Sequence, residues 1–231
     1  STYSNLMKLI EKEVQGVNTI YMTTQFGDIS GVHFKVGATK VGFTSFHRPV
    51  NLTERPVDVA GFLEQNGMQD HGEKICLGYA MTYRDFAGGT LGLAYVGTVC
   101  SKYSPTSTKQ RSSHSGIVTY LNHGHAVPTS SSYLTLAHEI GHNFGSPHDE
   151  TDECKGGADG QFIMWYSATS GNQPNNRKFS PCSIGIMSKK LHVDSGMCPS
   201  DTIPRSHKSI SAFDEPICGN GIREGDEVCD C

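Results

Sequence analysis

Three histidines lie close together in the segment HEIGHNFGSPHD, residues 138–149. His138 and His142 are four residues apart, a spacing that places both imidazoles on one face of a helix. Gly145 can adopt the positive φ of a sharp turn, and such a turn would bring His148 back beside them. Three nitrogen ligands with one open position are typical of a catalytic zinc site, whereas structural zinc sites fill all four positions. The spacing therefore predicts a catalytic zinc centre.

Glu139 directly follows the first histidine, so we expect its carboxylate beside the metal and not bound to it. A carboxylate in that position can take a proton from zinc-activated water and pass it to the leaving amine of a peptide. Glu139 is therefore the predicted general base and acid of metal-assisted amide hydrolysis. A helix with coincidental histidines is the alternative, and five residue types at fixed offsets argue against it. No cysteine pair precedes His138 at zinc-finger spacing, which excludes that class of site.

Composition narrows the classes of function. The net charge of −4 argues against a nucleic-acid partner, because such proteins carry a basic patch. No apolar run approaches the ~18 residues of a membrane span, so we expect this stretch to be soluble. The eight cysteines are scattered with no C-x-x-C pair, which favours disulfides and an oxidising compartment. A sequon at Asn51 agrees with glycosylation in that compartment, but such triplets also arise by chance.

Apolar periodicity predicts the elements that position the histidines. Residues 129–132 are four good capping residues ahead of the histidine-bearing helix. Strands interleaved with helices predict an α/β sandwich. Loops are expected over residues 46–58 and 101–115, and a domain boundary near residues 200–215. The predicted helices cover residues 6–21, 59–66, 133–144 and 183–193, and the predicted strands cover residues 32–36, 74–83, 90–97 and 117–121.

With these residues in hand, the sequence resembles the metzincin zinc endopeptidases. Asp149, directly after the third histidine, resembles the adamalysin (ADAM) branch, in which a structural acid anchors the motif. Met164 in QFIMWYSAT is similar to the methionine of the turn beneath the metal, and an ordinary core methionine is the alternative. The stretches VNTIYMTT, LGLAYVG, NNRKFSPCS and PICGNGIREGDEVCDC extend the resemblance over nearly the whole chain. They resemble the Kuzbanian-like, alpha-secretase type of ADAM.

The resemblance implies a fold and a domain order. The implied fold has a mixed, mostly parallel sheet with an antiparallel edge strand, packed by helices. Its active-site cleft lies between a larger N-terminal and a smaller, irregular C-terminal subdomain. The catalytic domain would cover residues 1–205 with its first strand missing, and residues 216–231 would begin a truncated disintegrin domain.

The resemblance also implies an activity. The parent protein would be a membrane-anchored, extracellular protease that sheds the ectodomains of other cell-surface proteins. Its membrane contact would lie outside this chain. A non-catalytic adhesion or binding module and an inactive fragment are the alternative interpretations. The four intact motif residues favour the enzyme over both.

Further site residues follow from the same resemblance. The strand formed by Gly92, Leu93, Ala94 and Tyr95 would pair with an extended substrate, as in other cases of strand addition. The segment of Ser167, Ala168 and Thr169 would wall the pocket for the side chain after the scissile bond. A loop His-x-His, formed by His123 and His125, can also bind metal, but the neighbouring site is already complete.

The implied disulfides are Cys100–Cys198 and Cys154–Cys182. Cys76 would lack its family partner, and the last three cysteines, Cys218, Cys229 and Cys231, would pair beyond the chain's end. The acidic tail resembles a disintegrin calcium loop, and oxygen-rich acidic loops suit Ca²⁺. An uncapped flexible tail is the alternative. The candidate calcium ligands are the side chains of Asn220, Glu224, Glu227 and Asp230.

Overall fold

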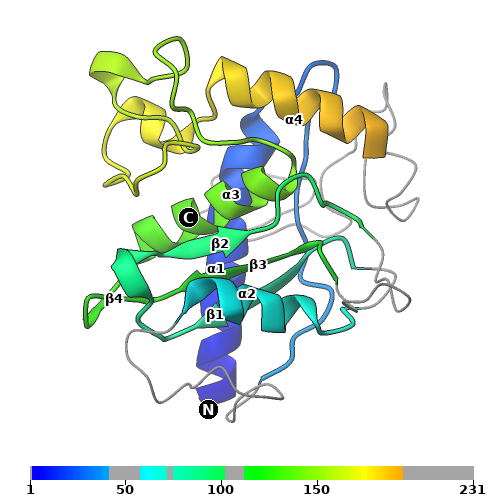
Figure 1. Cartoon of the computed structure of the whole chain (residues 1–231), viewed down its shortest axis with the longest axis vertical. Helices are drawn as coiled ribbons and strands as arrows, with labels where there is room; N and C mark the ends of the chain where they lie inside the picture. Colours follow the sequence, from blue (N-terminus) through cyan, green and yellow to red (C-terminus); the bar gives the residue numbers. More distant parts are fainter. Residues whose placement is uncertain (1, 42–57, 72–74, 102–111, 195–231) are drawn as a thin grey trace, which may run out of the picture.

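The computed structural model describes residues 2–41, 58–71, 75–101 and 112–194. Within these ranges a small central sheet lies between helices, which confirms the α/β class (Figure 1). None of the described helices is long and apolar enough to cross a bilayer.

The helices are α1 (Thr2–Thr23), α2 (Val59–Gly67), α3 (Thr129–Asn143) and α4 (Pro181–Asp194), with short 3₁₀ turns η1 (Ala87–Gly89), η2 (Gly157–Asp159) and η3 (Pro174–Arg177). The strands are β1 (Gly78–Thr82), β2 (Gly92–Ala94), β3 (Ser115–Thr119), β4 (Leu121–Asn122) and β5 (His125–Ala126).

The sheet is mixed, as expected, with the strand order β1-β3-β2. β1 runs parallel to β3, with Gly78 opposite Ser115. β2 runs antiparallel to β3, with Gly92 opposite Val118. In the part of the chain that the structure describes, β2 pairs with β3 alone and forms the edge of the sheet.

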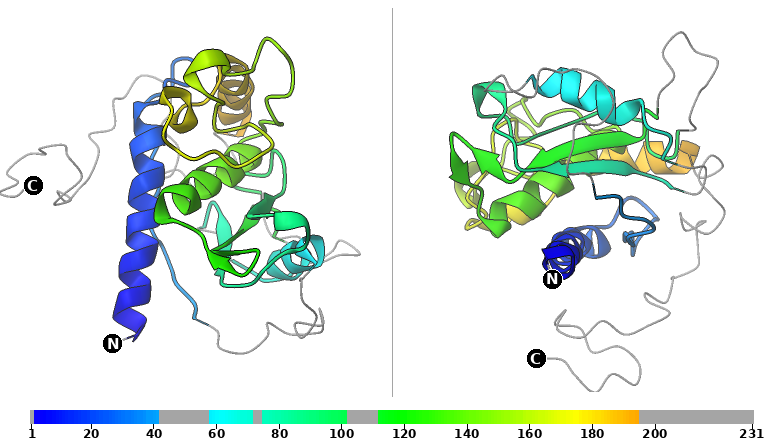
Figure 2. Two further views of the ribbon diagram at one scale, coloured as in Figure 1. Left: turned by 90° about the vertical axis from the view of Figure 1, so that its left-hand side faces the viewer. Right: turned by 90° about the horizontal axis from the view of Figure 1, so that it is seen from below.

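Helices cover both faces of the sheet, which gives three layers (Figure 2). Neighbouring residues of a strand point to opposite faces, and all five residues of β3 are buried. Ile117 packs with Phe62 and Leu63 of α2 on one face. Val118 packs on the other face with the core formed by α1 and α3. The helix that carries the first two histidines therefore rests directly on the sheet.

Tyr21 of α1 lies at the centre of the larger core. Its ring contacts those of Phe34, Phe144 and Phe179, with centroids 5.0 to 5.6 Å apart in near-perpendicular arrangements. Its hydroxyl donates a hydrogen bond to the carbonyl of Ala137 in α3 at 3.0 Å. Aromatic contacts and a satisfied buried hydroxyl both stabilise this arrangement. The N-terminal helix α1, which the sequence predicted, thus packs against the histidine-bearing helix α3 and stabilises its position.

The predicted strand over residues 32–36 is wrong. The side chain of Asn18 accepts a hydrogen bond from the Phe34 N–H at 2.7 Å and donates one to the Phe34 carbonyl at 3.0 Å. One side-chain amide therefore takes the place of a strand partner at Phe34, the middle residue of this segment. Val32 is buried, as the alternation indicated, but Val36 is 40% exposed.

The other predicted strands exist but are shorter or shifted. β2 keeps only three residues, because Gly97, with a φ of +67°, begins a turn soon after them. β3 starts two residues before the predicted range, and the β4–β5 hairpin after it was not expected. α3 begins at Thr129, directly after Pro128, so the predicted capping residues lie inside its first turn. One of them, Ser132, donates instead to the buried carboxyl of Glu13 at 2.6 Å.

Candidate metal centre

The predicted helix and turn around the histidines are both present. α3 ends two residues before Gly145, which has a φ of +96°. The Gly145 N–H donates to the His142 carbonyl at 2.8 Å, and the Ser146 N–H donates to the Gly141 carbonyl at 3.0 Å. These two bonds define a Schellman C-cap. Because glycine tolerates this φ, the chain reverses at once and returns His148 to the face of the helix.

The three histidines converge on one point. One ring nitrogen from each of His138, His142 and His148 lies within 4.8 Å of the others. The Nε2 atoms of His142 and His148 are 3.2 Å apart. The Nδ1 atom of His138 lies 2.6 Å from the Ile163 carbonyl, and that of His142 lies 2.7 Å from the Ser146 carbonyl. Since a carbonyl only accepts, both Nδ1 atoms carry the proton, and each Nε2 keeps a free lone pair.

This set of donors fits a zinc ion. Lone pairs directed at one point repel each other unless a cation lies between them. A hydrogen bond from the second ring nitrogen to a carbonyl is the usual way of orienting a metal-binding imidazole. Burial lowers the pKa of His138 to about 3 and also lowers the pKa of His142. Both rings are therefore neutral near pH 7, the state in which imidazole binds metal. No other cluster of three metal-binding side chains occurs among the described residues.

The carboxyl group of Glu139 lies buried beside the edge strand. Its side chain is 5% exposed, and its Oε2 has no hydrogen-bond partner in the described part of the chain. Burial raises the pKa of Glu139 to about 8. A Cβ added to Gly92 of β2 would lie 2.6 Å from Glu139 Oε1, so the carboxyl group packs directly on the strand backbone. This position suits proton exchange with a polar group bound between the strand and the histidines.

Met164 packs against the histidine helix and is fully buried. A Cβ at Gly141 would lie 2.5 Å from its sulfur, so this glycine makes room for the methionine. The Met164 carbonyl accepts a hydrogen bond from the Asp149 N–H at 2.8 Å. The preceding carbonyl, that of Ile163, orients His138. The carbonyls of Ile163 and Met164 therefore bond to His138 and Asp149, the first and last residues of the histidine motif.

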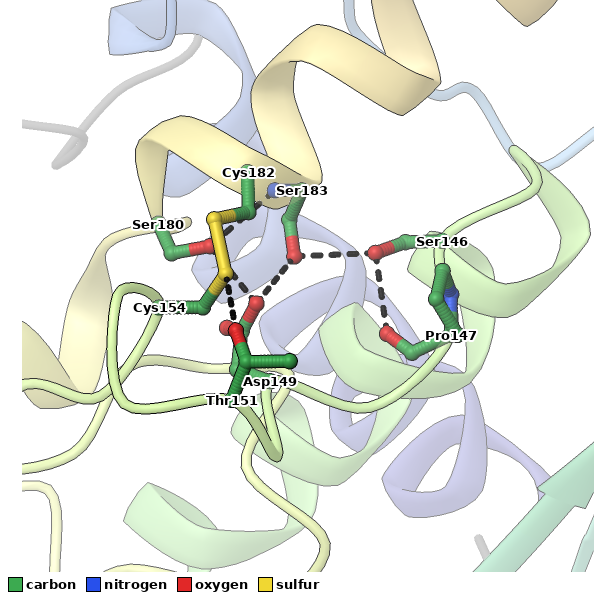
Figure 3. The surroundings of a disulfide bond; sticks show 8 residues. All are labelled: Ser146, Pro147, Asp149, Thr151, Cys154, Ser180, Cys182 and Ser183. Atoms are coloured by element: carbon green, nitrogen blue, oxygen red, sulfur yellow. Dashed lines mark hydrogen bonds between the residues drawn. A yellow bond between two sulfur atoms is a disulfide. The ribbon is translucent and has the colours of Figure 1, made fainter.

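Asp149 attaches the histidine motif to the start of α4 (Figure 3). Its Oδ1 accepts hydrogen bonds from the hydroxyls of Ser180 at 2.6 Å and Ser183 at 2.8 Å. The disulfide Cys154–Cys182, the pairing that the resemblance implied, lies beside these bonds. Asp149 is not part of the group of converging ligand atoms. Its place in the structure is that of an anchor.

A family model described as reprolysin-like, metallo-peptidase family M12B, matches residues 5–193. The chain belongs to the reprolysin-like metallopeptidases. It is 42% identical to a disintegrin and metalloproteinase domain-containing protein 10 homolog of Caenorhabditis elegans, over 100% of this chain and 28% of that protein. It is 39% identical to disintegrin and metalloproteinase domain-containing protein 10 of Homo sapiens, over 96% of this chain and 30% of that protein. The chain thus spans less than a third of these relatives.

The structure brings one predicted wall residue of this reprolysin-like chain close to the strand that was predicted to bind substrate. Gly92, Leu93 and Ala94 form the edge strand β2. Of the three predicted wall residues, Ala168 lines a pocket of about 230 Å³, and this pocket also includes Leu91, directly before β2. Ser167 and Thr169 do not line it. The remaining lining residues are Asn122, His125, Ala126, Val127, Pro128 and Ser131.

Other predicted residues of the reprolysin-like chain do not join the three converging ligands or lie outside the described ranges. His123 and His125 lie at the β4–β5 hairpin and belong to no cluster of three possible ligands among the described residues. Cys100 is disulfide-bonded, but its predicted partner Cys198 lies outside those ranges. The sequon at Asn51, the predicted domain boundary and the disintegrin segment lie outside them as well, and nothing described supports a calcium site. The candidate calcium ligands in that segment are Asn220, Glu224, Glu227 and Asp230.

Sequence reasoning missed Asn143. In this reprolysin-like chain the residue is fully buried, and its amide bonds to three separate segments. It follows Ile140 by three positions on the stripe of α3 that also buries Leu136. A polar residue on an apolar stripe is the signal that would have revealed it. No side-chain pattern would have shown that the carbonyls of Ile163 and Ser146 orient the histidines.

Proposed function

We propose that this chain is a zinc-dependent endopeptidase domain in which His138, His142 and His148 hold the metal and Glu139 moves the protons. One observation carries the proposal: three imidazole nitrogens converge on one point, and the residue directly after the first histidine has a buried carboxyl group. Membership of the reprolysin-like metallopeptidases supports it. In a protease of this kind the substrate is a peptide bond and the product is a free amine and a carboxylate.

In the proposed reaction, different residues orient the metal ligands and transfer the proton. When bound, zinc supplies a Lewis acid that acidifies a coordinated water and polarises the substrate carbonyl. The Ile163 and Ser146 carbonyls keep His138 and His142 in the tautomer that directs Nε2 toward the centre. Glu139 would take a proton from the attacking water and deliver it to the leaving nitrogen, and burial, which disfavours the charged form of its carboxyl group, strengthens it as the base.

We further propose that the substrate is an extended polypeptide that pairs with β2. This strand lies at the sheet edge within the described ranges, and an edge strand offers a row of backbone donors and acceptors. The contact between Gly92 and Glu139 supports this, because a peptide along β2 would pass beside the carboxyl group. The pocket that joins Leu91 to Ala168 is the candidate receptor for the side chain after the scissile bond.

The setting of the parent protein is also a proposal. We infer an extracellular or cell-surface protease that sheds ectodomains and is attached to the membrane by regions outside this chain. The disulfide-bonded Cys154, Cys182 and Cys100 support an oxidising compartment. The names of these relatives combine a disintegrin and a metalloproteinase domain, which supports the same domain order in this chain. We infer a catalytic domain over residues 1–205 and a disintegrin segment from 216 to 231.

Zinc content and cleavage of an internally quenched extended peptide test the proposal. We expect the wild-type chain to bind zinc and to cleave the peptide, and a chelator to abolish cleavage. Glu139→Gln should retain zinc and lose roughly 10²- to 10⁴-fold in kcat, the range for loss of an acid–base group. Glu11→Gln, on the exposed face of α1, is the matched control and should behave as wild type.

Two outcomes count against the proposal. If the zinc-loaded wild-type chain does not cleave the quenched peptide, a binding module or an inactive fragment is the better interpretation. If Glu139→Gln retains full activity with zinc bound, the role assigned to Glu139 is wrong.

A further inference from the structure

We propose that Asn143 is a positioning residue whose buried amide sets the position of the edge strand β2 relative to the metal-binding helix α3. The inference rests on the proposed function, because it concerns how the substrate edge is held against the metal centre. Glu139 packs against Gly92 of β2 without a hydrogen bond to it, whereas the Asn143 side chain bonds directly to the segment that leaves this strand. Asn143 directly follows His142 in the chain and is fully buried.

The side chain of Asn143 reaches the segment that leaves β2 and also β3. Its Nδ2 donates to the Tyr95 carbonyl at 2.9 Å. The same nitrogen lies 3.2 Å from the Thr98 hydroxyl and 3.2 Å from the Ser115 carbonyl. Three acceptors surround a group with two hydrogens, so every donor is used. One amide therefore connects the helix to the sheet edge and to the strand behind it.

The oxygen of the same amide connects α3 to β1. Asn143 Oδ1 accepts a hydrogen bond from the hydroxyl of Tyr79, which is in β1. The Tyr79 ring crosses β3 over Gly116, where any side chain would collide with the ring. The missing side chain at Gly116 thus lets a tyrosine from the far strand reach the helix. Both ends of the Asn143 amide are occupied, which fixes its orientation.

The backbone at this end of α3 makes a parallel connection. The His142 carbonyl accepts from the Gly97 N–H at 2.8 Å, and the Asn143 carbonyl accepts from the Thr98 N–H at 2.9 Å and the Val99 N–H at 3.0 Å. The last carbonyls of a helix have no partner within the helix. Here the segment that continues β2 supplies two partners for the Asn143 carbonyl and a second partner for the His142 carbonyl, which also accepts from Gly145. A shift of β2 would therefore disturb the residue that carries the second metal-binding imidazole.

A purely structural role is the competing explanation, and energetics alone do not separate the two. Replacing Asn143 alone leaves its buried partner groups without hydrogen bonds, which costs stability whatever the role of the amide. What such an amide adds is one defined arrangement of the segments that it joins. We therefore expect losing it to lower the catalytic efficiency of correctly folded, zinc-loaded molecules, beyond any loss of stability.

The test compares Asn143→Asp with a matched control in the 231-residue chain. Asn66→Asp is that control, because the Asn66 amide joins α2 to the carbonyls of Gly78 at 3.0 Å and Gly116 at 2.9 Å, and neither bond involves α3 or β2. Activity is normalised to bound zinc. Two peptides are used, a long one that reaches along β2 and a short one truncated next to the scissile bond.

We expect Asn143→Asp to lower kcat/KM for the long peptide by roughly tenfold to a hundredfold, the scale of a misplacement of about 1 Å. The preference for the long over the short peptide should shrink at the same time. Asn66→Asp should change stability but leave kcat/KM per bound zinc close to that of wild type, because the Asn66 amide bonds to neither α3 nor β2. Equal kcat/KM for Asn143→Asp and wild type, or equal losses in both variants, would overturn the inference.

Tyr79→Phe keeps the test decisive if Asn143→Asp does not fold. It removes only the hydroxyl that fixes the Asn143 amide and leaves the ring in place. We expect a severalfold loss in kcat/KM for the long peptide with zinc content unchanged, and no loss would contradict the role of the amide. If wild type itself shows no zinc-dependent cleavage, the proposed function fails. If wild type is active and both variants match it, only the inference fails.

Discussion

Gly92 of the edge strand packs against the carboxyl group of Glu139: a Cβ at this glycine would lie 2.6 Å from Oε1 and 2.8 Å from Cγ. Real Cβ atoms do not approach other atoms so closely, so Gly92→Ala must displace the carboxyl group. We expect kcat to fall about tenfold or more, because proton transfer depends on position. Zinc content should not change, since no histidine is touched. Steady-state kinetics with metal analysis checks this, and an unchanged kcat would contradict it.

Gly141 makes room for Met164 beneath the helix. A Cβ there would lie 2.5 Å from the methionine sulfur and 3.3 Å from the Phe179 ring. We expect Gly141→Ala to reduce the free energy of unfolding by about 1–3 kcal/mol, the usual effect of overpacking a core. Gly185→Ala in α4 is the matched control, because a Cβ at Gly185 meets nothing within 4 Å. Urea unfolding should separate the two variants, and equal midpoints would show that the core accommodates the added methyl group without strain.

Asp149 holds the third histidine's segment through two serine hydroxyls. Asp149→Ala would leave the buried hydroxyls of Ser180 and Ser183 without their acceptor. We expect a loss of about 1–3 kcal/mol in stability, the range for a buried polar group that loses its partner. We also expect weaker zinc retention in a chelator competition. Asp149→Asn keeps an acceptor oxygen, so it should retain much of the stability and much of the zinc retention of wild type. If the two variants behave alike, the hydroxyl contacts are not what anchors the motif.

Glu13 is a buried carboxyl group between α1 and α3, and burial raises its pKa above the ordinary 4.5. The folded state therefore binds the proton more tightly than the unfolded state. This contribution to stability is fully present below pH 4.5 and is lost as the pH rises through the folded-state pKa. Glu13→Gln does not ionise, and it keeps an acceptor for Ser132.

The expected signature is a difference between Glu13→Gln and wild type that depends on pH. We subtract the free energy of unfolding of wild type from that of Glu13→Gln. This difference should be larger near neutral pH than at about pH 4, which is close to the pKa of a free carboxyl group. Chemical denaturation across that range measures this. Glu11→Gln, at an exposed position of the same helix, should show no comparable trend. A constant difference across the range would mean that Glu13 does not titrate as its burial indicates.

The helices and the histidine motif were predictable because their signals are local. The apolar stripe that includes Val17 and Tyr21 identified α1, and both residues are fully or almost fully buried. The spacing of His138, His142 and His148 identified a converging set before any fold was known. Gly145 was expected to turn the chain, and its φ of +96° shows that it does.

The contacts that complete the site were not predictable, because they join residues far apart in the sequence. Nothing in the residues around Gly92 indicates that this glycine would face Glu139. The predicted strand at residues 32–36 failed for the same reason, since the amide of Asn18 replaced the missing strand partner. Alternation of side chains indicates which residues are buried, but it does not show what satisfies the backbone.

Within the described ranges the outer side of β2 pairs with no other strand, and this has a consequence beyond substrate binding. Hydrogen-bonding groups of a sheet edge do not discriminate between chains, so an edge that accepts a peptide substrate, as we propose, would equally accept a stretch of any partly unfolded neighbour. Self-association and premature cleavage would then be two outcomes of the same strand edge. Covering that edge during synthesis and transport would suppress both at once.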